Sequence, residues 1–159
     1  MPFVAEKFSD YEGFATASLD EIYGESLEGA YYREVNEFSS GILYNNGGQL
    51  EFQFLPNAVQ IAPIMDCVVD DFNGDGIKDL LVAGNHFDAE VETTRHDAGN
   101  GCLLLGSNKG FVPQNVLYSG FYAPFNTKDL ELIQVGGMNY VFVATNNNRM
   151  TVFACKAGM

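Results

Sequence analysis

The sequence predicts a mainly β protein with a short helical segment at its N-terminus. Three observations support this prediction: an alternating apolar run near residue 52, two short apolar runs on either side of an acidic, glycine-rich loop, and a pattern that recurs after about sixty residues. The chain has 159 residues, of which 47% are hydrophobic, so it can form one domain with a core, or at most two small domains.

Helical signals are confined to the N-terminal part of the chain. Ser18 followed by Glu21 is a capping box, in which the Ser18 hydroxyl accepts from an early amide and the Glu21 carboxylate reaches back. Apolar residues then recur at helical spacing, whereas Gly24 and Gly29 interrupt any long helix. We therefore expect short helical pieces in an N-terminal arm, residues 1–33, that packs on the rest of the protein.

From residue 34 onward the pattern changes to that of β-strands. Residues 50–54 read Leu-Glu-Phe-Gln-Phe, and this alternation is the period of a half-buried strand. The Asn-Asn-Gly-Gly sequence at residues 45–48 precedes the run and is a hairpin turn signal. Residues 34–159 are therefore predicted to form a β domain.

The most specific motif is the loop at residues 71–79, which places an oxygen-bearing group at every second position. A hard cation such as Ca²⁺ takes about 6–8 oxygen ligands, and a short loop can supply most of them. Gly74 and Gly76 provide the positive φ angles that let the backbone curl around an ion. The predicted ligands are the side chains of Asp71, Asn73, Asp75 and Asp79 and the backbone carbonyl of Ile77.

This loop differs from an EF-hand. An EF-hand needs a bidentate Glu at its twelfth position, on an exiting helix, and the residue at that position is Val82. The flanking residues 64–70 and 80–84 are short apolar runs that suit buried strands. The unit is therefore predicted to be strand–loop–strand, with the ion bracing the turn. The alternative is a solvated hairpin turn without metal.

A weak internal repeat runs through the β region. Residues 41–47 resemble residues 101–107, and residues 79–85 resemble residues 140–146. A several-strand unit that recurs in this way is typical of propeller blades or a related β array, so we expect about two blade-like units of antiparallel strands. Their approximate ranges are 34–100 and 101–159. The acidic loop does not recur in the second unit, and no metal site is expected there.

The loop and the strand after it carry a family resemblance. Residues 71–79, followed by Leu-Leu-Val-Ala-Gly-Asn at 80–85, resemble the calcium loop and strand of FG-GAP/VCBS repeats. Those repeats build the blades of integrin-α-like propellers and of many large bacterial exported proteins. Residues 41–52 and 55–64 resemble, more loosely, the C-terminal part of such bacterial proteins, where a helical insert precedes the last blades. The resemblance implies Ca²⁺ coordination by the five loop residues.

The same resemblance implies an extracellular, periplasmic or cell-surface protein with an interaction or structural role and no catalysis. Residues 1–7 lack the basic and apolar regions of a signal peptide, so an exported protein would be represented here by a mature fragment or by an excised piece with an added Met1. A closed propeller has roughly 4–8 blades, more than the two expected here. The expected partners are therefore the remainder of a larger propeller or another copy of the chain, with a glycan or a protein ligand as further candidates.

Charge and composition exclude several other classes of function. The net charge is -13 and the eight Lys and Arg residues are scattered, which argues against binding to a nucleic acid backbone. No run of about 18 apolar residues is present, so no membrane-spanning helix is expected. The three cysteines are odd in number and none has CxxC spacing, which disfavours a zinc site.

Two weaker groups of residues leave alternatives open. The polar connection at residues 85–100 is expected to be a solvated loop, but its ionisable side chains could also form a second metal site or the pocket of a carboxylate-dependent hydrolase. These side chains are Asp88, Glu90, Glu92, His96 and Asp97. A carbohydrate-binding module is the other alternative, because aromatic rings near this loop could stack on sugars. These rings belong to Tyr118, Phe121, Tyr122 and Phe125.

Overall fold

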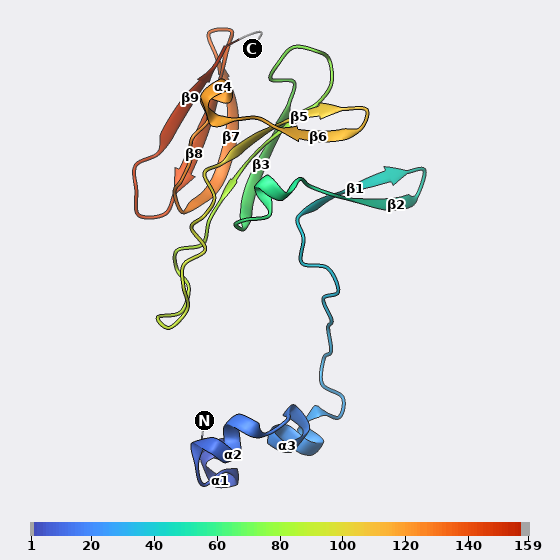
Figure 1. Cartoon of the computed structure of the whole chain (residues 1–159), viewed down its shortest axis with the longest axis vertical. Helices are drawn as coiled ribbons and strands as arrows, with labels where there is room; N and C mark the ends of the chain where they lie inside the picture. Colours follow the sequence, from blue (N-terminus) through green and yellow to red (C-terminus); the bar gives the residue numbers. More distant parts are fainter. Residues whose placement is uncertain (1, 157–159) are drawn as a thin grey trace. The chain divides into compact units, whose positions relative to one another are not determined.

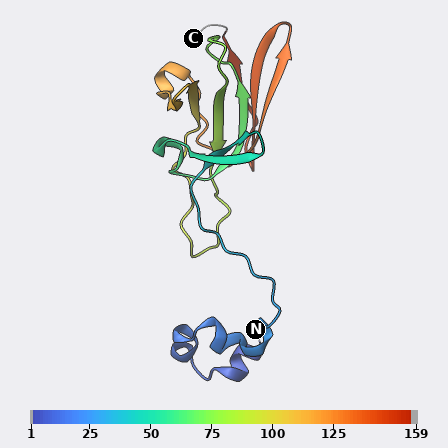
Figure 2. The same ribbon diagram turned by 90° about the vertical axis from the view of Figure 1, so that its right-hand side faces the viewer.

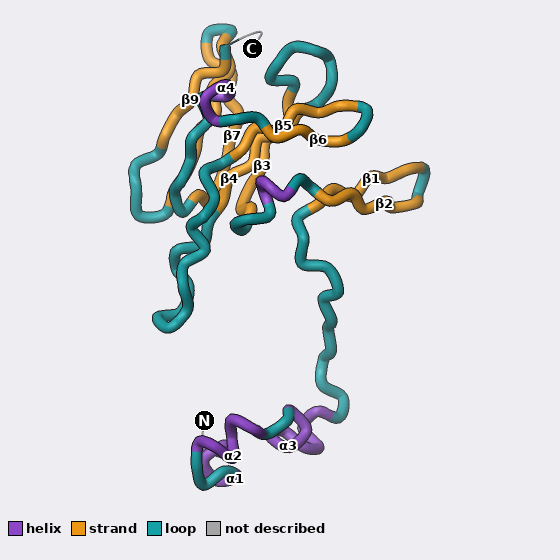
Figure 3. The backbone as a smooth tube through the Cα atoms, viewed as in Figure 1, coloured by secondary structure: helices purple, strands orange, loops and turns teal. Residues whose placement is uncertain are grey.

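The computed structural model describes residues 2–156 and is mainly β, with 38% of residues in strands and 18% in helices. The strands form three antiparallel sheets, and within these residues none of them closes into a barrel (Figures 1 and 3). The predicted mainly β class with a helical N-terminal segment is therefore confirmed. The chain divides into two compact units, Met1–Phe38 and Ser39–Met159.

The first unit is helical and its helices are short, as the sequence predicts. The Ser18 backbone N–H donates to the Glu21 carboxylate at 2.8 Å, and the Glu21 N–H donates to the Ser18 hydroxyl at 3.3 Å, which confirms the capping box. These hydrogen bonds, first the one from the Ser18 backbone, lower the pKa of Glu21. The helices are α1 Pro2–Lys7, α2 Tyr11–Thr16, α3 Leu19–Tyr23 and the 3₁₀ helix η1 Gly24–Leu27.

The second unit contains all the strands. The two-stranded sheet is β1 Gly41–Asn46 with β2 Gln49–Phe54, and the 3₁₀ helix η2 Asn57–Val59 follows it. The four-stranded sheet is β3 Ile64–Asp70, β4 Asp79–Gly84, β5 Cys102–Ser107 and β6 Gly110–Pro113, in that order. After the short helix α4 Val116–Ser119, the three-stranded sheet is β7 Thr127–Val135, β8 Met138–Thr145 and β9 Thr151–Cys155.

The four-stranded sheet is covered on both faces. One face packs against β7–β9, where β3 lies beside β7 (Figures 1 and 2). The core there consists of Val68, Leu81, Ala83, Leu103, Phe121, Ala123, Leu130, Val141 and Val143. The opposite face packs against η2 and the β1–β2 hairpin, and its core consists of Leu55, Val59, Leu80, Val82 and Leu104, with Ile42 and Phe111 against them. Every residue of β4 is buried, as predicted for the strand after the loop.

The β1–β2 hairpin forms where the alternating run predicts a strand, but its apolar side is not the buried one. Ile42 packs on the four-stranded sheet, and Gln53 lies against Gly110 of β6. Leu50, Phe52 and Phe54 point the other way and are exposed. The reason is register: strand neighbours alternate between faces, and the turn at residues 47–48 pairs Ile42 with Gln53 on the packed side.

The β3–β4 and β7–β8 strand pairs share two features, a register shift and a hydrogen bond from an Asn that follows the second strand. Each has a register shift near its start, between Ile64 and Asp66 in one pair and between Thr127 and Asp129 in the other. In each, the Asn after the second strand donates its backbone N–H to the residue before the first strand. Asn85 donates to the Pro63 carbonyl at 3.0 Å and Asn146 to the Asn126 carbonyl at 2.9 Å.

Asp66, at the bulge in β3, also ties the two larger sheets together. Its carboxylate accepts from the Leu130 N–H of β7 at 2.6 Å and from its neighbour Cys67 at 2.8 Å. A buried backbone donor that loses its partner costs free energy, so this bond helps to set how the sheets meet.

Replacing Leu104 by Ala is expected to destabilise the protein by about 2–5 kcal/mol, because the Leu104 side chain is fully buried and its loss leaves a cavity. Urea unfolding followed by circular dichroism measures the effect. The matched variant Leu117→Ala removes an exposed side chain and should change stability by less than about 0.5 kcal/mol. Equal losses in the two variants would contradict this placement of the core.

Candidate metal centre

Asp71 organises the loop between β3 and β4. One of its carboxylate oxygens accepts from the Gly74 N–H at 2.7 Å and from the Asp75 N–H at 3.1 Å, and the other accepts from the Gly76 N–H at 2.8 Å. Gly74 has φ 79° and Gly76 has φ 86°, a region that favours glycine. The backbone therefore wraps around the Asp71 carboxylate, with Gly74 and Gly76 at the positive φ angles that the sequence predicts.

Asn73 and Asp75 continue the same pattern. The Asn73 side-chain oxygen accepts from the Asp75 N–H at 2.9 Å, and the Asp75 carboxylate accepts from the Ile77 N–H at 2.8 Å. The Asn73 amide also donates to Asp75 at 3.0 Å. The bond from Ile77 and then the bond from Asn73 lower the pKa of Asp75. The loop thus holds its exposed carboxylate ionised and in a defined orientation.

Asp79, the first residue of β4, is fully buried. One of its oxygens accepts from the Phe72 N–H at 2.9 Å and the other from the Gly106 N–H of β5 at 2.8 Å. Gly106 fits because a Cβ there would lie 2.1 Å from the Lys78 carbonyl oxygen. Gly106 is absent from the sequence prediction, since it lies 27 residues from Asp79 and only strand pairing brings the two together.

Charge compensation at this site comes from backbone amides. Among residues 2–156 the one ion pair joins the Lys78 ammonium to Asp70 at 3.1 Å, and it is exposed. Asp71, Asp75 and Asp79 have no cationic side chain paired with them within that range. Burying a carboxylate is costly unless hydrogen bonds or a cation offset its charge. A donor set of carboxylate, amide and carbonyl oxygens is the chemistry that Ca²⁺ prefers.

The three aspartates are held by their own amide partners. No group of three or more His, Cys, Asp or Glu side chains that could hold a metal ion occurs between residues 2 and 156. The side chains of Asp71, Asp75 and Asp79 therefore do not converge into a group of this kind in the structure, and the other two predicted ligands are the Asn73 amide oxygen and the Ile77 carbonyl. Asp71, Asn73 and Asp75 are linked by hydrogen bonds in one turn, whereas Asp79 lies beneath the loop at the start of β4.

A groove beside the loop is lined by two of the four rings considered for sugar stacking, Tyr118 and Phe121. It has two adjoining parts of about 270 and 300 Å³, which share Phe72, Leu103, Tyr118 and Ser119. Tyr118 is 79% exposed, but Phe121 belongs to the core between the sheets. Because one of the predicted rings is buried, the set does not present a continuous stacking platform.

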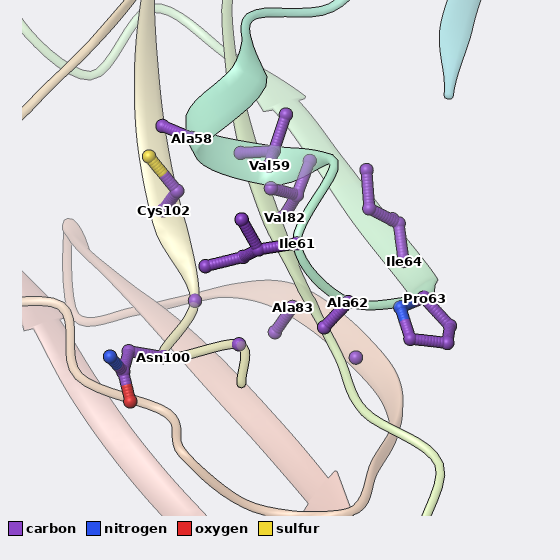
Figure 4. Close-up of a pocket in the computed structure, with 13 residues that line it drawn as sticks. Ala58, Val59, Ile61, Ala62, Pro63, Ile64, Val82, Ala83, Asn100 and Cys102 are labelled. Carbon is purple, nitrogen blue, oxygen red and sulfur yellow. The ribbon is translucent and has the colours of Figure 1, made fainter. Parts of the chain in front are cut away.

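A second hollow lies between η2 and β4–β5 and is shown in Figure 4. Its volume is about 30 Å³, comparable to the share of a single water molecule. The side chains around it are mostly apolar, among them Val59, Ile61 and Val82, with Asn100 as a polar side chain at one side. This hollow is too small to hold an organic ligand.

The 85–100 connection is exposed over most of its length, as expected for a solvated loop, but hydrogen bonds fix its two ends. His86 and His96 exchange backbone hydrogen bonds of 2.9 and 3.0 Å, and their rings stack at 6.5 Å. The buried Asn85 amide donates to the Gly99 and Phe125 carbonyls at 2.8 and 3.1 Å and accepts from the Gly99 N–H at 2.9 Å. These bonds hold both ends of the connection against the segment that leads into β7.

Asp88 is held apart from the other acids of this connection. Its carboxylate accepts from the side-chain amides of Asn126 at 2.8 Å and Asn146 at 3.1 Å, and these two bonds lower its pKa. Glu90, Glu92 and Asp97 are exposed. Asp88 thus connects the loop to the β7–β9 sheet, and this role was not apparent from the sequence because Asn126 and Asn146 lie 38 and 58 residues away.

No protein-family model, curated protein or solved structure matches this chain. None of the helices between residues 2 and 156 has the length and apolar character needed to cross a membrane.

Without added calcium, Asp79→Asn is expected to destabilise the protein by about 1–3 kcal/mol, because the Asn amide group would face one of two backbone N–H donors. Chemical denaturation in a chelator-containing buffer measures this. The exposed Asp97→Asn is the matched control and should be near neutral. A neutral Asp79→Asn would show that the two amide bonds contribute little.

Stability is also expected to fall at acidic pH through Asp88. Its pKa is lower in the folded protein than in the unfolded chain, so its contribution is present above the ordinary Asp pKa of about 4 and is lost as the pH falls through the lower folded value. Denaturation midpoints at several pH values test this, and Asp88→Asn should flatten the acid-side slope. An unchanged slope in that variant would assign the acid sensitivity to other carboxylates.

Proposed function

We propose that this chain is a calcium-binding β-repeat domain of the FG-GAP/VCBS type, with a structural or interaction role and no catalysis. The observation that carries the proposal is the loop between β3 and β4. Its backbone winds around the Asp71 carboxylate, and the buried Asp79 carboxylate closes its base without a cationic side chain among residues 2–156. This strand–loop–strand arrangement fits a hard cation better than it fits a plain turn.

The bound ion would be held by oxygen atoms only. Asp71, Asn73 and Asp75 would supply side-chain oxygens from the turn, Ile77 its carbonyl and Asp79 a carboxylate oxygen from beneath. Calcium offsets the mutual repulsion of three carboxylates within nine residues. Because Asp79 also accepts from Gly106, the ion would stiffen the contact of β5 with the loop as well as the turn itself.

We further propose that the two larger sheets are blades of a propeller-type array. Each sheet is an antiparallel meander in sequence order, and the shared register shift and the Asn bonds at the strand ends support an equivalence between β3–β5 and β7–β9. The proposed blades then span residues 64–113 and 127–155. The predicted boundary near residue 100 falls between β4 and β5, inside the first of them.

We also propose that the protein is exported. The acidic composition and the calcium loop support it, because extracellular calcium is millimolar and fills weak sites. The hydrolase alternative gains no support from the 85–100 connection, since Asp88 is bound to two side-chain amides and not paired with a second acid.

Calcium is expected to raise the melting temperature, and a chelator to lower it. A ligand that binds only the folded state stabilises it by about 2.7 kcal/mol at one hundred times its Kd. Differential scanning calorimetry at micromolar to millimolar Ca²⁺ measures the shift, and isothermal titration calorimetry measures binding directly. Asp75→Ala should abolish both responses, because it removes a ligand that is exposed in the loop.

Asp97→Ala is the matched control, since it removes an exposed aspartate outside the loop and should keep the calcium response. Lack of any calcium-dependent shift at millimolar Ca²⁺ would refute the metal site. A response that survives in Asp75→Ala but not in Asp97→Ala would place the ion in the 85–100 connection.

A further inference from the structure

The outer face of the β1–β2 hairpin is apolar. Leu43 and Leu50 are 59% and 67% exposed, and the Phe52 and Phe54 rings contact each other edge-on on the same face. These four residues define the hairpin face. Exposed apolar groups gathered on one strand pair mark a surface that another surface covers.

The outer face of the β7–β9 sheet carries exposed apolar side chains together with the acids Asp129 and Glu131 of β7. Leu130, Val141 and Val143 point toward β3–β6, so strand alternation puts their neighbours on the far side. The exposed members there are Ile133, Val135, Met138 and Val152, and the half-buried Phe142 pairs with Val152 across the strands. These five residues define the terminal face.

Each of these two exposed faces corresponds to a face of the four-stranded sheet that is already covered within the second unit. In the four-stranded sheet, Leu104 of β5 pairs with Pro113 of β6, and its side chain is covered by the hairpin and by η2. On the hairpin, Leu43 pairs with Phe52 in the same hairpin register but is uncovered. Leu43 therefore occupies the position in the hairpin that Leu104 occupies in the four-stranded sheet.

The same correspondence holds at the other end of the stack. Leu103 pairs with Leu81 on the face of β3–β6 that β7–β9 covers. In the three-stranded sheet the matching pair, counted from the register shift, is Val152 with Phe142. Val152 therefore occupies the position of Leu103, but 44% of it remains exposed. The terminal face is thus equivalent in register to a face that already receives a sheet, with Glu131 in the position of the buried Val68.

We propose that the terminal face of one copy of this chain binds the hairpin face of a second copy, so that β-layers stack head to tail. This inference rests on the blade arrangement proposed above. The two faces of one copy cannot meet each other, because β3–β6 lies between the hairpin and β7–β9. They are also different surfaces, so the contact is heterologous and either closes into a ring or continues into a longer array.

The test uses the full chain with a charge placed on one face at a time. Leu43→Lys disables the hairpin face, and Val152→Lys disables the terminal face; both positions are exposed, so folding should survive and circular dichroism checks this. Analytical ultracentrifugation and light scattering should show that the wild type associates. Each variant alone should be a monomer, with association weakened at least about tenfold. Val112→Lys, at an exposed position on β6, is the matched control and should associate like the wild type.

Mixing the two variants gives the decisive measurement. Leu43→Lys retains an intact terminal face and Val152→Lys an intact hairpin face, so the mixture should form a one-to-one dimer and nothing larger. A monomeric wild type would overturn the proposal and would fit coverage of these faces by other parts of the same polypeptide. A dimer formed by either variant alone would overturn it in favour of a two-fold contact.

Repeating the measurements with calcium and with a chelator separates this inference from the proposed metal site. A mixed dimer without any calcium response would support stacking and refute the metal site. A calcium-dependent melting temperature with a monomeric wild type would support the metal site and refute stacking.

Discussion

The buried carboxylate of Asp79 connects the loop, β4 and β5 of the second unit. It accepts one hydrogen bond from the loop, at Phe72, and one from β5, at Gly106, while its own backbone begins β4. A buried charge tolerates few arrangements, because each lost hydrogen bond leaves it uncompensated. Loop conformation, the start of β4 and the position of β5 are therefore coupled through one side chain.

This coupling explains why a surface loop can influence the interior. β4 is buried along its whole length and contributes Leu81 and Ala83 to one core and Leu80 and Val82 to the other. Phe72 in the loop packs against the core shared with β7–β9. An ion that orders the loop would act on the strand that both cores share, so its effect on stability would extend beyond the loop.

The stacked sheets also explain the two exposed faces at the ends of the second unit. The internal layer, β3–β6, buries apolar side chains on both sides, whereas the hairpin and the β7–β9 sheet each bury only one side. The same alternation that builds the cores therefore leaves Leu43 and Val152 exposed. A calcium-braced stack with two complementary ends combines the proposed metal site and the proposed association in one architecture.

The sequence alone determined the local features of this protein. The oxygen spacing at residues 71–79, the capping box at Ser18 and Glu21, and the buried strand that became β4 all depend on neighbours within a few residues. Contacts between distant residues were decided only by the tertiary structure. Gly106 beneath Asp79, Asp66 on the Leu130 amide and Asp88 on Asn126 and Asn146 all join distant segments. The tertiary structure also determined which side of the hairpin is exposed, because strand alternation defines two faces and packing determines which of them is buried.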